Sequence, residues 1–189
     1  HWYYDLGAAV GAIPTNDGQT CVFASVSPER VEARRGQGLE TLHREALSEG
    51  SPDLAGRVAG SRGPGRLRAF AGHHGFFRQA TGPGWALAGD AGFFRDPITA
   101  HGITDALRES EFLARAILEG DDAALVAYRA QRDERVAGFF DITDQIASFE
   151  WDMEEVKDQH LVLAREMNAL VDATRTLDLE SSVSVLVSS

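Results

Sequence analysis

The stretch GDAGFFRDPITAHGITDALRES, residues 89–110, places small residues, an acid and a proline directly before an amphipathic helix. If Asp90 is buried at the mouth of that helix, its carboxylate needs a hydrogen-bonding partner. The first turn of a helix also presents unpaired backbone N–H groups and a partial positive charge. The stretch therefore predicts a site that combines a carboxylate acceptor with a cradle of backbone donors.

The small residues restrict what such a site could hold. Gly89 and Gly92 would let a ligand approach the backbone closely, and Pro97 would stiffen the loop. Gly102 would begin the helix without a side chain in the way, while Asp90 could accept hydrogen bonds from hydroxyl groups. These requirements suit a polyol chain joined to a polar ring that becomes negatively charged when reduced. A flavin fits this description.

The stretch closely resembles the second FAD-binding motif of FAD-dependent aromatic hydroxylases and other GD-motif flavoprotein monooxygenases, GDAAHxxxPxxGxGxNxAxxD. Counted from Asp90, the proline of the pattern falls at Pro97, its last glycine at Gly102 and its last alanine at Ala106. The residue after the last glycine is the apolar Ile103. The resemblance implies that Asp90 holds a ribityl hydroxyl of FAD, that the N–H groups of Gly102 and Ile103 face the pyrimidine edge of the ring, and that Pro97 lies beside it. The predicted cofactor-binding residues are Gly89, Asp90, Ala91, Gly92, Pro97, Gly102 and Ile103.

The chain departs from the family pattern at several positions, which affects the surroundings of the ring. Phe93 replaces the histidine, Thr104 the asparagine and Glu109 the final aspartate, and the middle glycine of the pattern is replaced as well. The first 30 residues also resemble, less closely, the aromatic-x-P-x-x-D-G turn of flavin halogenases and geranylgeranyl reductases. Together these resemblances cover roughly residues 1–120.

The resemblance implies an FAD-dependent oxidoreductase, most simply an NAD(P)H-driven monooxygenase that uses O₂ to hydroxylate a small organic, possibly aromatic, substrate. A flavin-dependent halogenase or a geranylgeranyl-reductase-like enzyme is the alternative, and a non-catalytic helical interaction module, working through residues 121–176, is another. The family binds the ADP half of FAD with a GxGxxG turn, which this chain lacks. We therefore expect a C-terminal fragment whose partner is the missing N-terminal half, and we assign no catalytic acid or base.

The surrounding sequence indicates an α+β chain in three segments: substrate-domain sheet and helices over 1–80, the strand-loop-helix over 81–120, and a helical extension over 121–189. A β-hairpin turning at Asn16-Asp17-Gly18 is predicted over 1–27, then two short helices to residue 59. Short strands are predicted over 61–84, followed by a strand over 85–89 that is buried on both faces. A helix should run from Gly102 to a glycine cap at Gly120, and a second helix should begin at Asp121-Asp122. A third helix is predicted from about 141 to 176, before a β-prone tail over 181–189.

Composition excludes several classes of partner. The net charge of -11 argues against nucleic acid and anionic membranes, and no apolar run approaches the roughly 20 residues of a membrane span. Cys21 is the single cysteine, so a disulfide framework and a cysteine zinc site are excluded. We expect a reducing, cytoplasmic location, with Cys21 filling the core.

Several other residues admit both a functional and a structural interpretation. His101 precedes the helix that would face the flavin, but a loop histidine is the simpler interpretation, and adjacent His73-His74 lack further ligands at metal spacing. Four arginines could meet a pyrophosphate or lie on solvated strands, and four phenylalanines could line a pocket or fill the core. These sets are Arg62, Arg66, Arg68 and Arg78, and Phe76, Phe77, Phe93 and Phe94.

Overall fold

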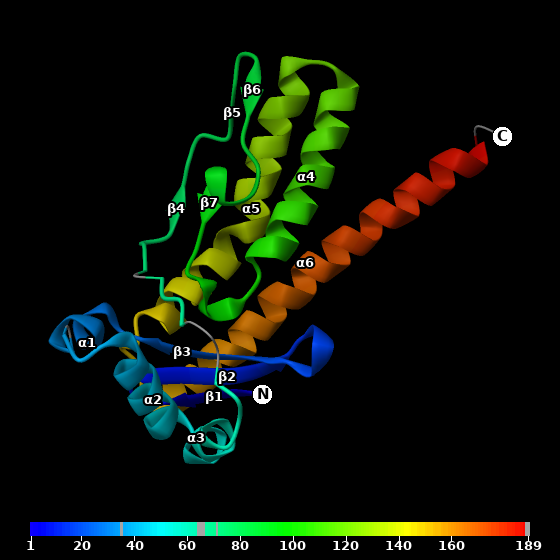
Figure 1. Ribbon diagram of the computed structural model, residues 1–189. Helices are drawn as coiled ribbons and strands as arrows, with labels where there is room; N and C mark the ends of the chain where they lie inside the picture. Colours follow the sequence, from blue (N-terminus) through cyan, green and yellow to red (C-terminus); the bar gives the residue numbers. More distant parts are fainter. Residues whose placement is uncertain (35, 64–66, 71, 188–189) are drawn as a thin grey trace. The chain divides into compact units, whose positions relative to one another are not determined.

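The computed structural model describes residues 1–34, 36–63, 67–70 and 72–187, with side chains as far as residue 176. The chain divides into two compact units, His1–Gly72 with Gln145–Val156 (unit 1) and His73–Asp144 with Lys157–Ser189 (unit 2). Both units mix helices with small antiparallel sheets (Figure 1), which confirms the mixed α and β character predicted from the sequence. The three-segment division at residues 80 and 120 stays a prediction.

Unit 1 is built on a three-stranded antiparallel sheet of order β1-β2-β3. The strands are β1 (Trp2–Asp5), β2 (Ala8–Pro14) and β3 (Thr20–Val26). The predicted hairpin is β2 and β3, and its turn is confirmed, because Asp17 and Gly18 take φ angles of 57° and 68°. The sequence reading missed the second hairpin, in which two residues join β1 to β2. Cys21 is exposed on β3, so the expectation that it fills the core is wrong.

Three helices, rather than the predicted two, follow the sheet: α1 (Pro28–Ala33), α2 (Leu39–Gly50) and α3 (Pro52–Ala59). Ser27 and Ser51 cap α1 and α3, each accepting a hydrogen bond from a first-turn backbone N–H and each followed by proline. Helix α2 packs on the sheet. The core between them is formed by Val10, Ala12, Leu47 and Leu54.

The second part of unit 1 is the junction between α5 (Asp122–Ala147) and α6 (Met153–Val187). A helix break at Phe139-Phe140 was expected, but α5 runs through these residues and ends seven residues after Phe140, at Ala147. Phe149 takes a φ of 57°, and the Trp151 indole N–H donates to the Ile146 carbonyl at 2.8 Å, which pairs one of the last carbonyls of α5. The Trp151 ring also lies 6.2 Å from the ring of Tyr4 on β1.

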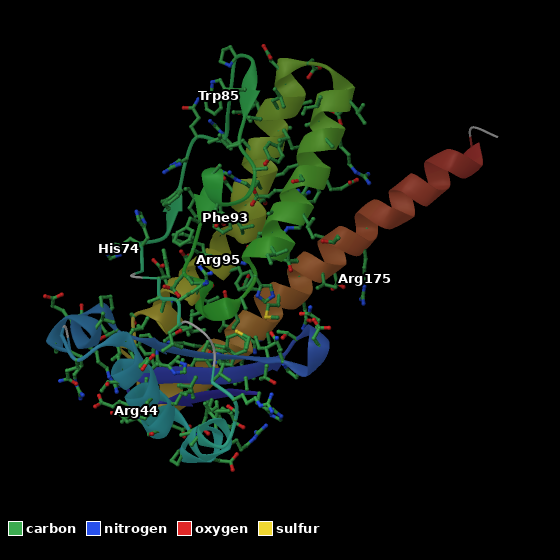
Figure 2. All side chains as sticks on the ribbon, in the orientation of Figure 1. Arg44, His74, Trp85, Phe93, Arg95 and Arg175 are labelled. Carbon is green, nitrogen blue, oxygen red and sulfur yellow. The ribbon has the colours of Figure 1, made fainter. Side chains whose placement is uncertain are left out.

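Unit 2 begins with two short strand pairs. β4 (Phe76–Phe77) pairs with β7 (Phe93–Phe94), and β5 (Thr81–Gly82) pairs with β6 (Trp85–Ala86). The predicted buried strand over 85–89 is wrong, since only two of its residues form a strand and Trp85 is 44% exposed (Figure 2). The physical reason is local: Gly84, at φ 76°, turns β6 back onto β5, and Gly89, at φ 58°, ends the extended run.

The long helices of unit 2 begin with α4 (Gly102–Glu119), which ends at Gly120 in the left-handed conformation, as predicted. Helix α5 begins as predicted too, with the Ala124 N–H donating to the Asp121 carboxylate at 2.7 Å. The predicted β-prone tail is instead helical and continues α6 to Val187. A helix pairs its own backbone groups, whereas a strand needs a neighbour. None of these helices, as far as they are described, is long and apolar enough to cross a bilayer.

Helix α4 does not bury the face that its sequence predicts. Ile103, Leu107 and Ile117 belong to the apolar stripe, yet they are 81%, 70% and 60% exposed. The buried positions of α4 are instead mostly charged: Asp105, Arg108, Glu109 and Ala116. Helix α4 therefore buries three charged side chains while several of its apolar side chains stay exposed.

Candidate functional site

The predicted site begins at a tight turn, the 3₁₀ segment η2 (Gly89–Ala91). Gly89 takes a φ of 58°, which side-chain-bearing residues rarely adopt, and a Cβ at this position would lie 3.1 Å from the Cβ of Ala106. The turn closes with a hydrogen bond from the Gly92 N–H to the Gly89 carbonyl at 2.9 Å. Glycine is thus required both by the backbone conformation and by the close approach of α4.

The turn brings Asp90 to the first residue of α4, although twelve positions separate them in the sequence. The Asp90 Oδ1 lies 3.9 Å from the position that a Cβ of Gly102 would occupy. Asp90 is exposed, which corrects the expectation that it might be buried, and its carboxylate accepts no hydrogen bond from the residues that the structure describes. An exposed acceptor therefore stands directly beside a helix N-terminus.

The N-terminus of α4, beside Asp90, has no side-chain cap. The N-cap residue His101 makes no side-chain capping hydrogen bond, and Ala100 before it takes a left-handed φ of 55°. Gly102 has no side chain and Ile103 is 81% exposed. The first-turn N–H groups of this helix, together with its positive dipole end, are available to an acceptor or an anion.

The loop between η2 and α4 is anchored from inside. It contains η3 (Pro97–Thr99), which begins with the Asp96 carboxylate accepting from the Ile98 N–H at 2.9 Å. Ile98 and Thr99 are buried, while Pro97 is exposed. Of the seven predicted cofactor-binding residues, five are exposed and two, Gly89 and Gly92, are buried within the turn.

A group of polar side chains that the sequence reading did not place lies behind the turn. The Glu109 carboxylate on α4 accepts from the Gly89 N–H at 2.8 Å, and Arg132 on α5 reaches Gly92, where a Cβ would lie 2.6 Å from its Nη1. Tyr128 donates to the Leu87 carbonyl at 2.9 Å. Burial raises the pKa of Glu109 to about 7, against the lowering effects of the Gly89 hydrogen bond and the Arg132 charge.

The resemblance to the second FAD-binding motif identifies Glu109 as the replacement for an aspartate, but no residue near Arg132 in the sequence indicates that Arg132 belongs to the site. Its position depends on how α5 packs, which the sequence alone does not give.

A second buried network lies where α4 begins. Arg95 and Arg108 both pair with the Asp105 carboxylate, and all three side chains are about 5% exposed. The Arg95 guanidinium also stacks over the Phe139 ring, 3.5 Å from its centroid. Because its two carboxylate oxygens each pair with a different guanidinium group, Asp105 is the central residue of this network, which joins the loop after β7 to α4 and α5.

Of the four phenylalanines considered for a pocket or for the core, only Phe93 is buried, whereas Phe76 and Phe94 are half-buried and Phe77 is 39% exposed. Phe93 (Figure 2) is 2% exposed. The centroid of its ring lies 4.9 Å from that of Phe77 and 6.0 Å from that of Phe140. His101 is half-buried, with its ring edge against Phe139. A direct part for His101 in the chemistry stays a prediction.

Among the four arginines considered, Arg78 contacts the turn of the predicted site. Its Nη1 donates to the Ala91 carbonyl at 3.2 Å, and its guanidinium lies 4.3 Å from the centroid of the Phe76 ring. Arg62 and Arg68 are in unit 1, and Arg66 lies outside the described residues. His73 and His74 join no group of three metal-ligating side chains within the described chain.

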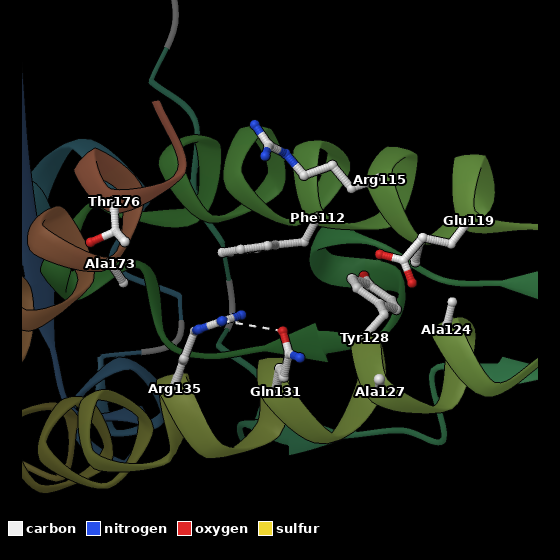
Figure 3. Close-up of a pocket in the computed structure, with 11 residues that line it drawn as sticks. Phe112, Arg115, Glu119, Ala124, Ala127, Tyr128, Gln131, Arg135, Ala173 and Thr176 are labelled. Atoms are coloured by element: carbon white, nitrogen blue, oxygen red, sulfur yellow. Dashed lines mark hydrogen bonds between the residues drawn. The ribbon is translucent and has the colours of Figure 1, made fainter. Parts of the chain in front are cut away.

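A cavity of about 520 Å³ opens between α4, α5 and α6, further along α4 than the turn (Figure 3). Phe112, Tyr128 and Arg135 form much of its wall, and the Arg135 guanidinium lies 4.2 Å from the centroid of the Phe112 ring. None of the seven predicted cofactor-binding residues lines this cavity. It is therefore separate from the η2 turn.

Comparison with known proteins gives a fold relation. No family model matches the chain, and no curated protein matches its sequence. A solved structure that resembles it is a triple mutant of the flavin-dependent brominase Bmp2, with a TM-score of 0.61 and 19% sequence identity. The match covers 92% of this chain and 49% of the brominase chain, so this chain spans about half the length of that structure. At this identity the likeness establishes a shared fold.

Proposed function

We propose that this chain forms the flavin-facing floor of an FAD-dependent oxidoreductase. The observation that carries the proposal is the meeting of Asp90 with Gly102 at the uncapped N-terminus of α4. This is the arrangement that the GD-motif resemblance implies, and the fold likeness to a flavin-dependent brominase supports it independently. A further segment with a GxGxxG turn would bind the ADP half of the cofactor.

Each residue of the site would have a defined task. The Asp90 carboxylate would accept hydrogen bonds from the hydroxyls of the ribityl chain, and the N–H groups of Gly102 and Ile103 would donate to the pyrimidine edge of the ring. The dipole of α4 would favour negative charge at that edge. Ala91 and Pro97, both exposed beside the turn and in the following loop, would limit the ring's position without adding charge.

FAD, when bound, supplies the redox chemistry: it takes reducing equivalents from NAD(P)H and makes O₂ reactive toward an organic substrate. The first candidate activity is therefore monooxygenation of a small organic, possibly aromatic, molecule, in a cytoplasmic protein. Halogenation is the second candidate, because the similar fold belongs to a brominase. By resemblance a halogenase would be expected to use a lysine near the flavin, and the single lysine of this chain is Lys157 on α6.

The test is flavin retention by the full-length protein that contains this chain. Asp90→Ala should weaken FAD binding about tenfold or more, because a charge-assisted hydrogen bond contributes on the order of 1.5–3 kcal/mol. Binding is measured by quenching of flavin fluorescence during titration. Glu111→Ala is the matched control, since Glu111 is a 54% exposed acid on α4 that pairs with Arg115 on the same helix. Equal retention in the wild type and the Asp90 variant would refute the role given to Asp90.

A further inference from the structure

The carboxylate of Glu109 is buried directly behind the turn that carries Asp90. Glu109 is 1% exposed, and its Oε2 accepts a hydrogen bond from the Gly89 N–H at 2.8 Å, across a separation of 20 residues. Its Oε1 has no hydrogen-bonding partner within the described structure. A buried carboxylate with half of its acceptor capacity unused is costly for the fold, so it calls for an explanation.

The bond that Glu109 makes falls on the residue that sets the turn. Gly89 has no side chain through which its neighbours could hold it, and its left-handed backbone depends on the hydrogen bonds at its two peptide groups. One of these is the bond closing the turn from Gly92, and the other is the bond to Glu109. Asp90 follows immediately, so the orientation of the Gly89 peptide determines where the Asp90 carboxylate stands relative to Gly102.

Charged groups face Glu109 from both elements that pack around it. On α5, Arg132 is 2% exposed and has an unpartnered Nη1 within the described structure, and Tyr128 lies nearby. On α4, the facing groups are Asp105 and Arg108. Arg132 also donates to the Arg78 carbonyl at 3.1 Å, so it connects α5 to the segment that directly follows β4. Glu109 and Arg132 thus hold the Gly89–Gly92 turn from its buried side.

We propose that Glu109 is a positioning residue of the flavin site, which fixes the Gly89 peptide from behind and thereby sets the place of Asp90 at the N-terminus of α4. The effect of Glu109 on flavin binding rests on the proposed function, but the hydrogen bond from Gly89 to Glu109 exists without any cofactor. An ionised Glu109 is a stronger acceptor than a protonated one, and it is attracted by Arg132. Because burial brings the pKa of Glu109 to about 7, the turn should tighten as the pH rises through that value.

The experiment follows the Gly89 amide by nuclear magnetic resonance in the full-length protein without flavin, using isotopically labelled glycine. In the wild type the Gly89 amide proton should shift with pH, with a midpoint near 7, and should exchange slowly with solvent. Glu109→Ala should speed that exchange about tenfold or more, since the acceptor is lost. Glu109→Gln keeps an acceptor, so it should retain slow exchange and lose the pH-dependent shift. Glu111→Gln, on the exposed side of α4, should change neither.

A Gly89 amide whose exchange is unchanged in Glu109→Ala, or whose pH midpoint persists in Glu109→Gln, would overturn the proposal. The glutamine variant preserves the size of the side chain, so a result is obtained even if the alanine variant does not fold. The flavin is then added: Glu109→Ala should retain FAD less well than Glu109→Gln. If the wild type binds no FAD while the Gly89 amide behaves as expected, the proposed function fails, but the hydrogen bond between Gly89 and Glu109 is still supported. If FAD binds equally to all variants, the positioning role of Glu109 fails.

Discussion

Replacing Glu109 by glutamine should change how the stability of the protein depends on pH. Burial raises the pKa of Glu109 from 4.5 to about 7. Between these two values the folded state binds a proton that the unfolded state has already released. The free energy of unfolding contributed by Glu109 must therefore fall as the pH rises through this window, and it becomes level above pH 7.

The size of the effect follows from the shift. Each unit of pKa difference corresponds to about 1.36 kcal/mol, and between pH 5 and pH 8 the linkage amounts to about 2.5 kcal/mol lost by the wild type. Glutamine does not titrate, so the variant lacks this loss. Any fixed cost or gain of the substitution is the same at both pH values, and it cancels when the two differences in stability are compared.

The assay is urea denaturation of the wild type and Glu109→Gln at pH 5 and pH 8, followed by circular dichroism. The stability of the variant relative to the wild type should rise by roughly 2–3 kcal/mol on going to pH 8. Glu111→Gln serves as the control, because its side chain is 54% exposed and should give no such change. A relative stability of Glu109→Gln that stays constant within about 0.5 kcal/mol would refute the reasoning, since the pKa of Glu109 could not then be raised.

Three further substitutions test the backbone and the buried charges. Gly89→Ala should destabilise the fold by about 1–2 kcal/mol, because alanine resists the left-handed φ and its Cβ would crowd Ala106; denaturant midpoints measure this, and an unchanged midpoint would contradict the turn conformation. Asp105→Ala should cost about 3–5 kcal/mol, because it leaves two buried guanidinium groups without their carboxylate. Arg95→Met should cost less in the same measurement, since Asp105 keeps Arg108, and the opposite order would contradict the arrangement of the network.

The parts of the fold with strong local signals could be predicted. The turn at Asp17-Gly18, the glycine cap at Gly120 and the start of α5 at Asp121 all depend on residues within a few positions of one another. A signal of the same kind stands at the start of α6. There the Asp152 carboxylate accepts from the N–H of Glu155 at 2.9 Å, and the Glu155 carboxylate accepts from the N–H of Asp152 at 2.8 Å, which is a capping box.

The strand over 85–89 shows where sequence reasoning failed. Its apolar run was taken as a sign of burial on both faces, but burial requires neighbouring elements, and within the described chain only β5 pairs with it. Asp90 and Gly102, which the sequence assigned to one site, do lie close together, and their role in cofactor binding stays a prediction. The pattern could not reveal Arg132, whose approach to Gly92 depends on the packing of α5.

The inverted faces of α4 change how amino-acid variants of this protein should be interpreted. Variant interpretation commonly ranks helix positions by hydrophobicity and treats a change from leucine to a polar residue as more damaging than a change at an acid. Along α4 that ranking is reversed for the stability of the described chain, because Leu107 is 70% exposed while Asp105 and Glu109 are buried and bonded. Glu109→Ala should therefore destabilise the protein more than a polar substitution at Leu107, although the residue types alone would suggest a mild change at the surface.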